Sequence, residues 1–159
     1  MLEVLPVTID NWREISRLKV REDQARFVAP NLRSIAETQF GFKDKPGLGH
    51  WTASSFGLYD EGQPVGYFMI ARNEQNPKMQ GYIVRLMVDE NYQGRGFGRF
   101  AMNWILETFR ADKTIRTVAI DYEPDNEAAR RLYASLGFRE TGEIEDGEVV
   151  AILELKKQG

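Results

Sequence analysis

Hydrophobic and polar positions along the chain change their period near residue 90. Residues 82–88 are nearly all apolar, with Arg85 as the only charge, and such a run is typical of a β-strand buried on both faces of a sheet. From residue 97 onward the apolar residues recur at helical spacing, at Phe97, Phe100, Ala101, Trp104, Ile105 and Phe109. The pattern therefore predicts a buried strand, a glycine-containing turn and a helix.

Several further elements are predicted before this unit. The first is a strand over residues 3–7, followed by a helix capped by Asp10 or Asn11 with the apolar stripe Trp12, Ile15 and Leu18. A second helix is capped by Asn31 and has the stripe Leu32, Ile35 and Phe40. A β-hairpin of residues 56–59 and 65–71 comes next. Residues 41–49 are rich in Gly, Lys, Asp and Pro, which predicts a mobile connection.

After the unit, the pattern predicts a second parallel strand and a C-terminal hairpin. Residues 115–122 form another largely apolar run. Because a helix joins this run to residues 82–88, the two strands are expected to lie parallel with a right-handed crossover. Asn126 is expected to cap a helix that ends at Gly137. The final antiparallel hairpin is predicted over residues 139–144 and 148–155.

Length and composition fit one domain. A chain of 159 residues can bury a core without disulfide or metal staples. The predicted fold is a single α/β (α+β) domain over residues 1–159, with a mixed central sheet of about seven strands and helices on both faces. The net charge of −3 argues against a nucleic-acid partner. The chain has no apolar run long enough to span a membrane, and its first residues lack a basic signal region. We therefore expect a cytoplasmic protein that does not associate with a membrane.

The chain contains no cysteine and only one histidine, His50. Thiolate catalysis, disulfides and thiolate zinc sites are therefore excluded, and no metal site is expected. His50 lies between Gly49 and Trp51 and has no Gly-x-Ser-x-Gly stretch to serve in a serine triad, so it is expected to be an ordinary loop residue. Any chemistry must use carboxylates, tyrosines, backbone amides or a bound cofactor.

The turn after residue 88 carries three glycines at alternate positions, Gly94, Gly96 and Gly98. Glycines let the backbone approach a bound group closely, and a helix that begins here directs unpaired N–H groups into the turn. Arg95 and Arg99 stand at the positive end of the helix dipole, where a cation is disfavoured by ~0.3–1 kcal/mol unless an anion lies nearby. The turn is either an anion site or a plain glycine turn with two solvated arginines, and the spacing favours the anion site.

Common phosphate loops differ from this turn. A dinucleotide fingerprint needs a glycine where Arg99 stands, a P-loop needs a Gly-Lys-Ser/Thr ending, and a kinase glycine loop leads into a strand. The order Gln93-Gly94-Arg95-Gly96-Phe97-Gly98 instead resembles the Gln/Arg-x-x-Gly-x-Gly/Ala pyrophosphate loop of the GNAT superfamily of acyl-CoA-dependent N-acetyltransferases. A second stretch similar to this family follows at the expected distance, Asn126-x-x-Ala129-x-x-Leu132-Tyr133-x-x-x-Gly137-Phe138.

The resemblance implies acetyl-CoA as the acyl donor. In the GNAT fold, amides of the glycine turn hold the pyrophosphate of coenzyme A, and the end of the preceding strand pairs with its amide-bearing arm. By motif, the arm residues are Leu86, Met87 and Val88, with Asn126 as a further candidate whose capping role explains it almost as well. The arm needs unpaired backbone groups, so the two parallel strands are expected to splay apart beyond Val88. The implied pyrophosphate residues are Gln93, Gly94, Arg95, Gly96, Phe97, Gly98 and Arg99.

Tyr133 is the candidate catalytic residue. Its spacing alone makes it a core aromatic, but the resemblance places a tyrosine here beside the thioester sulfur. A phenol of pKa ~10 can give its proton to a thiolate whose conjugate acid has a pKa of ~8.5, so Tyr133 is the expected general acid. Many family members carry a glutamate base on the strand before the glycine loop, where this chain has only Arg85. The base is left open between Asp121 or Glu123 acting through water and free amine drawn from solvent.

The expected acceptor is a primary amine of a small molecule. Several short phrases resemble the spermine/spermidine acetyltransferase branch and imply a polyamine: Asp10-Asn11-Trp12, Gln24 with Phe27-Val28-Ala29, residues 85–89, and Gly142-Glu143 with Gly147-Glu148. Carboxylates that could line a groove for a polycation are Glu22, Asp23, Glu37 and Glu148. Alternatives are an aminoglycoside, an amino acid whose carboxylate Arg85 receives, a protein amine, or a non-catalytic acyl-CoA-binding module. Family habit also implies a homodimer.

Overall fold

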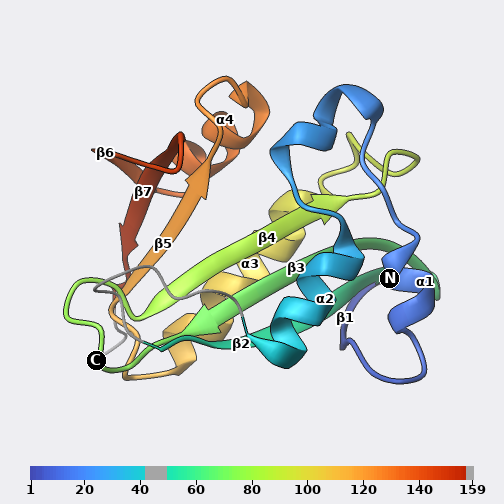
Figure 1. Cartoon of the computed structure of the whole chain (residues 1–159), viewed down its shortest axis with the longest axis horizontal. Coiled ribbons are helices and arrows are strands. Elements are labelled where there is room, and N and C mark those ends of the chain that lie inside the picture. Colours follow the sequence, from blue (N-terminus) through green and yellow to red (C-terminus); the bar gives the residue numbers. More distant parts are fainter. Residues whose placement is uncertain (42–49, 157–159) are drawn as a thin grey trace.

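One seven-stranded sheet organises the structure, a computed structural model that describes residues 1–41 and 50–156 (Figure 1). The strands lie in the order β1-β2-β3-β4-β5-β7-β6. They are β1 (Leu2–Pro6), β2 (Thr52–Asp60), β3 (Gln63–Arg72), β4 (Gly81–Val88), β5 (Thr117–Tyr122), β6 (Arg139–Glu145) and β7 (Glu148–Glu154). The helices are α1 (Trp12–Ser16), the 3₁₀-helix η1 (Glu22–Phe27), α2 (Asn31–Phe40), α3 (Phe97–Ala111) and α4 (Glu127–Ser135). The connection expected at residues 41–49 lies, apart from Gly41, outside the described residues.

Two tight turns close the predicted hairpins. Between β2 and β3, Glu61 and Gly62 both have positive φ (47° and 78°), and between β6 and β7, Asp146 and Gly147 do the same (50° and 82°). Two successive residues with positive φ form the type I′ turn, whose twist matches that of the flanking strands. Both antiparallel hairpins are therefore confirmed.

Strands β4 and β5 run parallel, as predicted, but separate early. Their pairing ends at Ile83 and Ile120, so the expectation that they splay only beyond Val88 is wrong. Val84 is an extra residue in β4 opposite the Met69–Ile70 step of β3. Such a β-bulge bends its strand and increases the local twist, which turns the end of β4 away from β5. The two strands diverge like the arms of a V (Figure 1).

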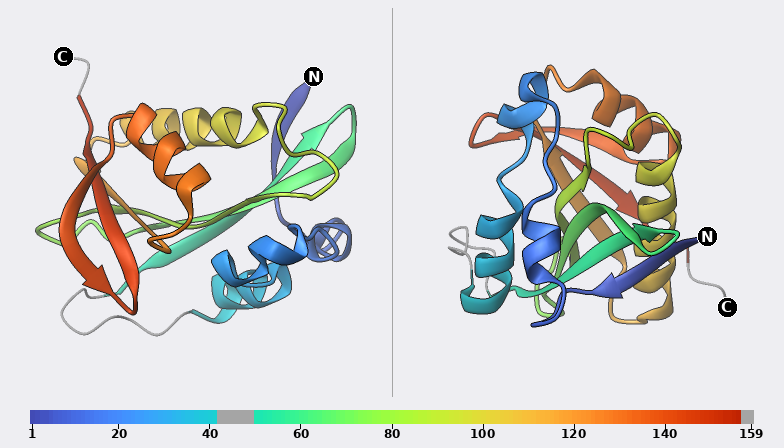
Figure 2. Two further views of the ribbon diagram at one scale, coloured as in Figure 1. Left: turned by 90° about the horizontal axis from the view of Figure 1, so that it is seen from above. Right: turned by 90° about the vertical axis from the view of Figure 1, so that its right-hand side faces the viewer.

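Helices cover both faces of the sheet, as predicted (Figure 2). One face is covered by α3 and α4 and the other by α1 and α2. The larger core cluster lies under α3 and α4 and includes Phe68, Ile70, Ile105, Phe109 and Tyr133. The second cluster consists of Ile15, Tyr59, Tyr67, Met69 and Met87. None of the helices in the described ranges is long and apolar enough to cross a membrane.

The buried face of α2 differs from the predicted one. Asn31 is the first helical residue rather than the cap, and its buried side chain donates a hydrogen bond to the Ile15 carbonyl in α1 (2.9 Å). The same carbonyl accepts from the Leu18 amide (3.2 Å), so Asn31 adds a second donor to it and ties the start of α2 to the end of α1. The helix is thereby rotated so that Leu32 and Phe40, both expected in the core, are 55% and 89% exposed. The predicted stripe of α2 is therefore wrong at these two positions.

Candidate active site

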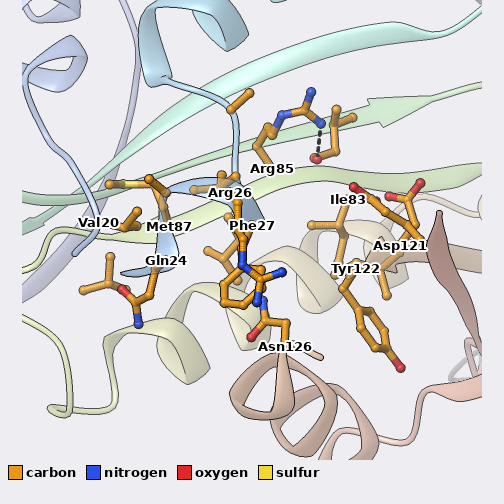
Figure 3. Close-up of a pocket in the computed structure, with 18 of the residues that line it drawn as sticks. Val20, Gln24, Arg26, Phe27, Ile83, Arg85, Met87, Asp121, Tyr122 and Asn126 are labelled. Atoms are coloured by element: carbon orange, nitrogen blue, oxygen red, sulfur yellow. Dashed lines mark hydrogen bonds between the residues drawn. The ribbon is translucent and has the colours of Figure 1, made fainter. Parts of the chain in front are cut away.

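A groove of about 560 Å³ occupies the gap where β4 and β5 diverge (Figure 3). Its walls come from the end of β4, the end of β5 and the first residue of β7, while η1 and the start of α2 lie across it. Tyr133 and Asn126 reach it from the α4 side. The groove therefore brings together residues that are far apart in sequence.

The open edge of β4 offers backbone groups to a ligand. The amide of Asp89 donates to the Val65 carbonyl of β3 (2.8 Å). Because successive residues of a strand point their backbone groups to opposite sides, those of Leu86 and Val88 face the gap, whereas those of Met87 face β3. The Met87 side chain also packs into the second core cluster. Of the three expected arm residues, Leu86 and Val88 are thus the ones whose backbone groups face the gap, and there the Val88 carbonyl already accepts from Gln93 Nε2 (3.0 Å).

The glycine turn is shaped to receive an anion. Gly94 and Gly96 have φ values of 76° and 82°, a conformation that favours glycine, and a Cβ atom added to either would meet nothing within 4 Å. Gly96 is the N-terminal cap of α3, and the first turn of this helix carries no acidic residue. The first N–H groups of a helix have no partner within it, and here they lie at the positive end of the helix dipole. This cradle and the open edge of β4 fit the pyrophosphate and arm of coenzyme A.

The other residues of the turn are held by neighbouring contacts. Arg95 lies over the ring of Tyr92, 5.3 Å from its centre, and Arg99 donates to the Ser135 hydroxyl at the end of α4 (2.9 Å). Phe97 packs its side chain into the larger core cluster, so only its backbone faces the turn. The turn is therefore fixed to both α3 and α4 before any ligand binds.

Tyr133 is held rigidly beside the groove. Its ring lies 5.5 Å from that of Tyr122 and 6.1 Å from that of Phe138. Burial raises the pKa of the Tyr133 phenol above its ordinary value, and the nearby Tyr122 and Asp121 act in the same direction. The side chain therefore stays protonated at neutral pH, as an acid must before it acts.

Asn126 serves α4 first. Its Oδ1 accepts a hydrogen bond from the Ala129 amide (3.2 Å), which confirms the predicted cap. Because Oδ1 is committed to the cap, only Nδ2 could donate to a cofactor arm. The two roles expected for Asn126 are therefore compatible.

Asp121 and Tyr82 form a hydrogen-bonded pair where β4 and β5 part. The Tyr82 hydroxyl donates to Asp121 Oδ1 (2.5 Å), and burial together with the Asp121 charge raises the pKa of Tyr82 well above its ordinary value. Asp121 and Glu148 line the groove, whereas Glu123 does not. Of the two carboxylates considered as a base, Asp121 is the one that faces the groove. A tyrosine in a buried strand is usual, so no sequence signal marked Tyr82.

The other expected carboxylates lie elsewhere. Glu37 pairs with Arg33 (2.8 Å) and lies 3.7 Å from Arg85, so its charge is compensated by arginines. Asp23 pairs with Arg21 (3.3 Å). Glu22 lines a neighbouring cavity between α1 and η1 rather than the groove. Of the four candidates, Glu148 alone lines the groove within the described residues.

Comparison with known proteins agrees with this geometry. A model of the Acetyltransferase (GNAT) family matches residues 12–138, which include both motifs and every residue that lines the groove except Glu148. The chain belongs to the GNAT acetyltransferase family. It is therefore an acetyl-CoA-dependent N-acetyltransferase, and the resemblance seen in its motifs is confirmed.

Similar proteins act on different amines. The chain is 26% identical to the spermine/spermidine N(1)-acetyltransferase of Bacillus subtilis (strain 168), over 97% of this chain and 99% of that protein. It is 35% identical to the N-alpha-acetyltransferase RimI of Mycobacterium tuberculosis over 54% of this chain and 52% of that one. The fold also matches the spermidine N-acetyltransferase of Vibrio cholerae solved with CoA and spermine (TM-score 0.70, 15% identity, 96% and 95% coverage).

Gly96→Val is expected to raise the KM for acetyl-CoA by about tenfold or more. A β-branched residue is strained at this positive φ by about 1–2 kcal/mol, and a shifted turn would misplace the N–H groups of this GNAT cradle. Steady-state kinetics at varied acetyl-CoA measure the effect. Gly62→Val is the matched control, since Gly62 has a similar φ of 78° in the β2–β3 turn. An equal rise in KM for Gly62→Val would contradict a specific role of the turn.

Proposed function

We propose that this GNAT protein acetylates a primary amine of a polyamine, with Tyr133 as the general acid and Asp121 as the group that takes a proton from the amine. The observation that carries the proposal is that both residues line the same groove, beside the open edge of β4. The proposal treats residues 1–159 as a single N-acetyltransferase domain.

The chain would hold the acyl donor with backbone groups. Acetyl-CoA supplies the acetyl group as a reactive thioester. Leu86 would bind the arm through its gap-facing backbone groups and Val88 through its amide, since the Val88 carbonyl accepts from Gln93. Gly94 and Gly96 would let the turn's amides bind the pyrophosphate. The Asn126 Nδ2 group would add a donor from the α4 side. Together these contacts would leave the acyl end of the donor in the groove that Tyr133 lines.

Tyr133 would release its proton only when a strong acceptor forms. The raised pKa of its phenol keeps the proton on Oη at neutral pH. Transfer of this proton to a free thiolate, whose conjugate acid has a pKa of ~8.5, is uphill. The proton would therefore move to sulfur as the C–S bond breaks, so that coenzyme A leaves as a neutral thiol. The rings of Tyr122 and Phe138 limit where Oη can move. Tyr133 is therefore suited to protonate the leaving group rather than to attack.

Asp121 would receive the proton that the amine must lose. An alkylammonium has a pKa of ~10.4, so at neutral pH it must be deprotonated before its nitrogen can attack. The carboxylate of Asp121 lines the groove, and its Oδ1 accepts from Tyr82, which holds the group in place. A carboxylate here can attract the ammonium and then accept its proton through water.

Two carboxylates of the groove and the relative that matches nearly the whole chain support a polyamine as the acceptor. Asp121 and Glu148 can each attract an ammonium group, while two of the three arginines that also line the groove, Arg26 and Arg33, are paired with Asp125 and Glu37. The relative from Bacillus subtilis is named for spermine and spermidine and matches nearly the whole chain. A free amino acid is the second candidate, because Arg85 also lines the groove and could receive a carboxylate. A homodimer and a cytoplasmic location complete the proposal.

A thiol-release assay tests the proposed function. Acetyl-CoA is incubated with the protein and with spermine, spermidine, an aminoglycoside or a free amino acid, and the released thiol is measured. Turnover is expected with spermine and spermidine at rates well above those of the other amines. Turnover with amino acids alone would replace the polyamine by the second candidate. Binding of acetyl-CoA without thiol release from any amine would contradict catalysis on small molecules.

A further inference from the structure

The 3₁₀-helix η1 lies across the groove without an anchor in either core cluster. None of its residues is buried, and only Gln24 and Phe27 are half-buried. Packing of apolar side chains therefore does little to fix its position. Val20 and Val28, on either side of η1, pack against the second core cluster. The helix itself is held by two side-chain contacts with residues that follow much later in the chain.

The first contact joins Gln24 to the glycine turn. Gln93 Nε2 donates to Gln24 Oε1 (2.9 Å) and to the Val88 carbonyl (3.0 Å), which uses both of its hydrogen atoms. Gln24 Oε1 also accepts from the Arg21 amide (3.3 Å), at the start of η1. The Gln93 side chain therefore ties η1 to the end of β4 rather than reaching toward a ligand.

The second contact joins Arg26 to the loop before α4. The Arg26 guanidinium donates to both oxygens of Asp125, at 3.2 and 2.5 Å. This bidentate pairing holds the pKa of Asp125 below its ordinary value. Asp125 directly precedes Asn126, which caps α4 and lines the groove. Arg26 therefore ties η1 to the β5 side of the opening.

We propose that η1 is a bridge between the two loops that hold the acyl donor, and that Gln24 and Arg26 are positioning residues for acetyl transfer. The two loops follow β4 and β5, the strands that diverge, and η1 lies between them at the mouth of the V (Figure 1). The segment after η1, residues 28–30, also lines the groove. The bridge thus joins the acceptor side of the groove to both donor-binding loops, so that amine and thioester meet in the right geometry.

Exchange of the two charges tests the bridge during turnover. Arg26→Asp and Asp125→Arg each place like charges together, and each is expected to lower kcat/KM for the amine by about three- to tenfold. The KM for acetyl-CoA is expected to rise by no more than about fivefold, because the backbone cradle is untouched and only the coupling of the cradle to η1 is lost. The double variant Arg26→Asp/Asp125→Arg restores an ion pair and should return kcat/KM to within about twofold of wild type. A double variant as slow as the single ones would overturn the proposal.

A binding experiment tests the bridge without any amine. This inference rests on the proposed function, since it needs coenzyme A in the groove. Hydrogen exchange of the amides of residues 21–27 is measured with and without coenzyme A. In wild type, coenzyme A should slow this exchange about fivefold or more, because both attachment loops become fixed. Gln24→Met keeps the side-chain length but removes the acceptor of Gln93, so this protection should be lost.

Asp23→Asn is the matched control for Gln24→Met, because Asp23 is exposed on η1 and contacts only Arg21 among the described residues. This variant should keep the protection. The bridge would be overturned if coenzyme A binds but leaves the exchange of wild type unchanged, or if it protects Gln24→Met as much as wild type. Acetyl transfer by the wild-type protein would show that the proposed function still holds in that case. Failure of wild type to bind coenzyme A would instead remove the proposed function, and the bridge with it.

Discussion

Tyr133→Phe is expected to lower kcat for acetyl transfer by about 10²–10⁴-fold, while the affinity for coenzyme A stays within about twofold of wild type. The substitution removes one hydroxyl group and keeps the ring that packs against Tyr122 and Phe138, so the fold is expected to survive. Without this hydroxyl, the thiolate must leave without a proton. Steady-state kinetics with a saturating amine and calorimetric titration with coenzyme A measure the two quantities.

Tyr59→Phe is the matched control for this prediction. The Tyr59 hydroxyl donates to Glu14 (2.7 Å) and lies in the second core cluster, away from the groove. Its loss should change kcat by less than about twofold, although it removes a hydrogen bond worth about 1 kcal/mol of stability. If Tyr133→Phe keeps more than about a third of the wild-type kcat, then Tyr133 is not the general acid.

The pH dependence of kcat is a second test of Tyr133 as the general acid. An acid acts in its protonated form, so its contribution is present below its pKa and is lost as pH rises through that value. Burial raises the pKa of Tyr133 above the ordinary value of about 10, which moves this loss to higher pH. The wild-type kcat should therefore rise as the amine is deprotonated and show no fall below about pH 10. A fall between about pH 7 and pH 9 would contradict this assignment.

Asp121→Asn is expected to lower kcat/KM for the amine by about 10²-fold near pH 7. Asparagine keeps an oxygen that can accept from Tyr82, so the local structure should be retained, but it cannot take a proton. The loss should shrink below about tenfold near pH 10, because free amine then becomes abundant in solution. Initial rates at subsaturating amine across this pH range provide the measurement.

Glu123→Gln distinguishes the two carboxylates considered as the base. Glu123 lies two residues after Asp121 but does not line the groove. Its carboxylate is close enough to Arg26 to interact with it electrostatically. Its neutral variant should keep kcat/KM within about threefold of wild type at every pH, since only the charge near the mouth changes. A large loss in Glu123→Gln with little effect in Asp121→Asn would assign the proton transfer to Glu123.

The central unit of the fold could be predicted because its signals are local. The change of period after Val88 marks the strand and the helix, and alternate glycines mark the turn between them. The structure places these elements as β4 and α3 and gives Gly94 and Gly96 the positive φ values that only glycine adopts readily. The cap at Asn126 could also be predicted, because it consists of one local hydrogen bond, from the Ala129 amide to the Asn126 side chain.

Features that depend on pairing across the sheet could not be predicted. The early separation of β4 from β5 follows from the bulge at Val84, which exists only relative to β3. The buried face of α2 follows from Asn31, whose side-chain amide donates to the Ile15 carbonyl of α1. Helical periodicity predicts that Leu32 is buried, because a hydrophobic pattern contains no information on a hydrogen bond to another helix. Tertiary hydrogen bonds therefore override the hydrophobic pattern at both places.

The candidate site divides in the same way. Motifs made Tyr133 and the glycine turn candidates, since each motif is a short continuous stretch of the sequence. Asp121 contacts Tyr82 because β4 and β5 are parallel neighbours. Arg26 contacts Asp125 because the ends of these two strands diverge and η1 lies between them. Such contacts join residues that carry no shared motif. Of the carboxylates proposed from the sequence, position in the folded chain alone separates Asp121 and Glu148 from the others.

The most direct measurement is mass spectrometry of spermidine after incubation with acetyl-CoA and either the wild-type protein or Tyr133→Phe. With wild type, the proposed function predicts spermidine that is heavier by one acetyl group, formed in step with free coenzyme A. Tyr133→Phe should produce almost none while it still binds coenzyme A. Unmodified spermidine with a wild-type protein that binds coenzyme A would contradict polyamine acetylation, and equal product from both proteins would contradict the role of Tyr133.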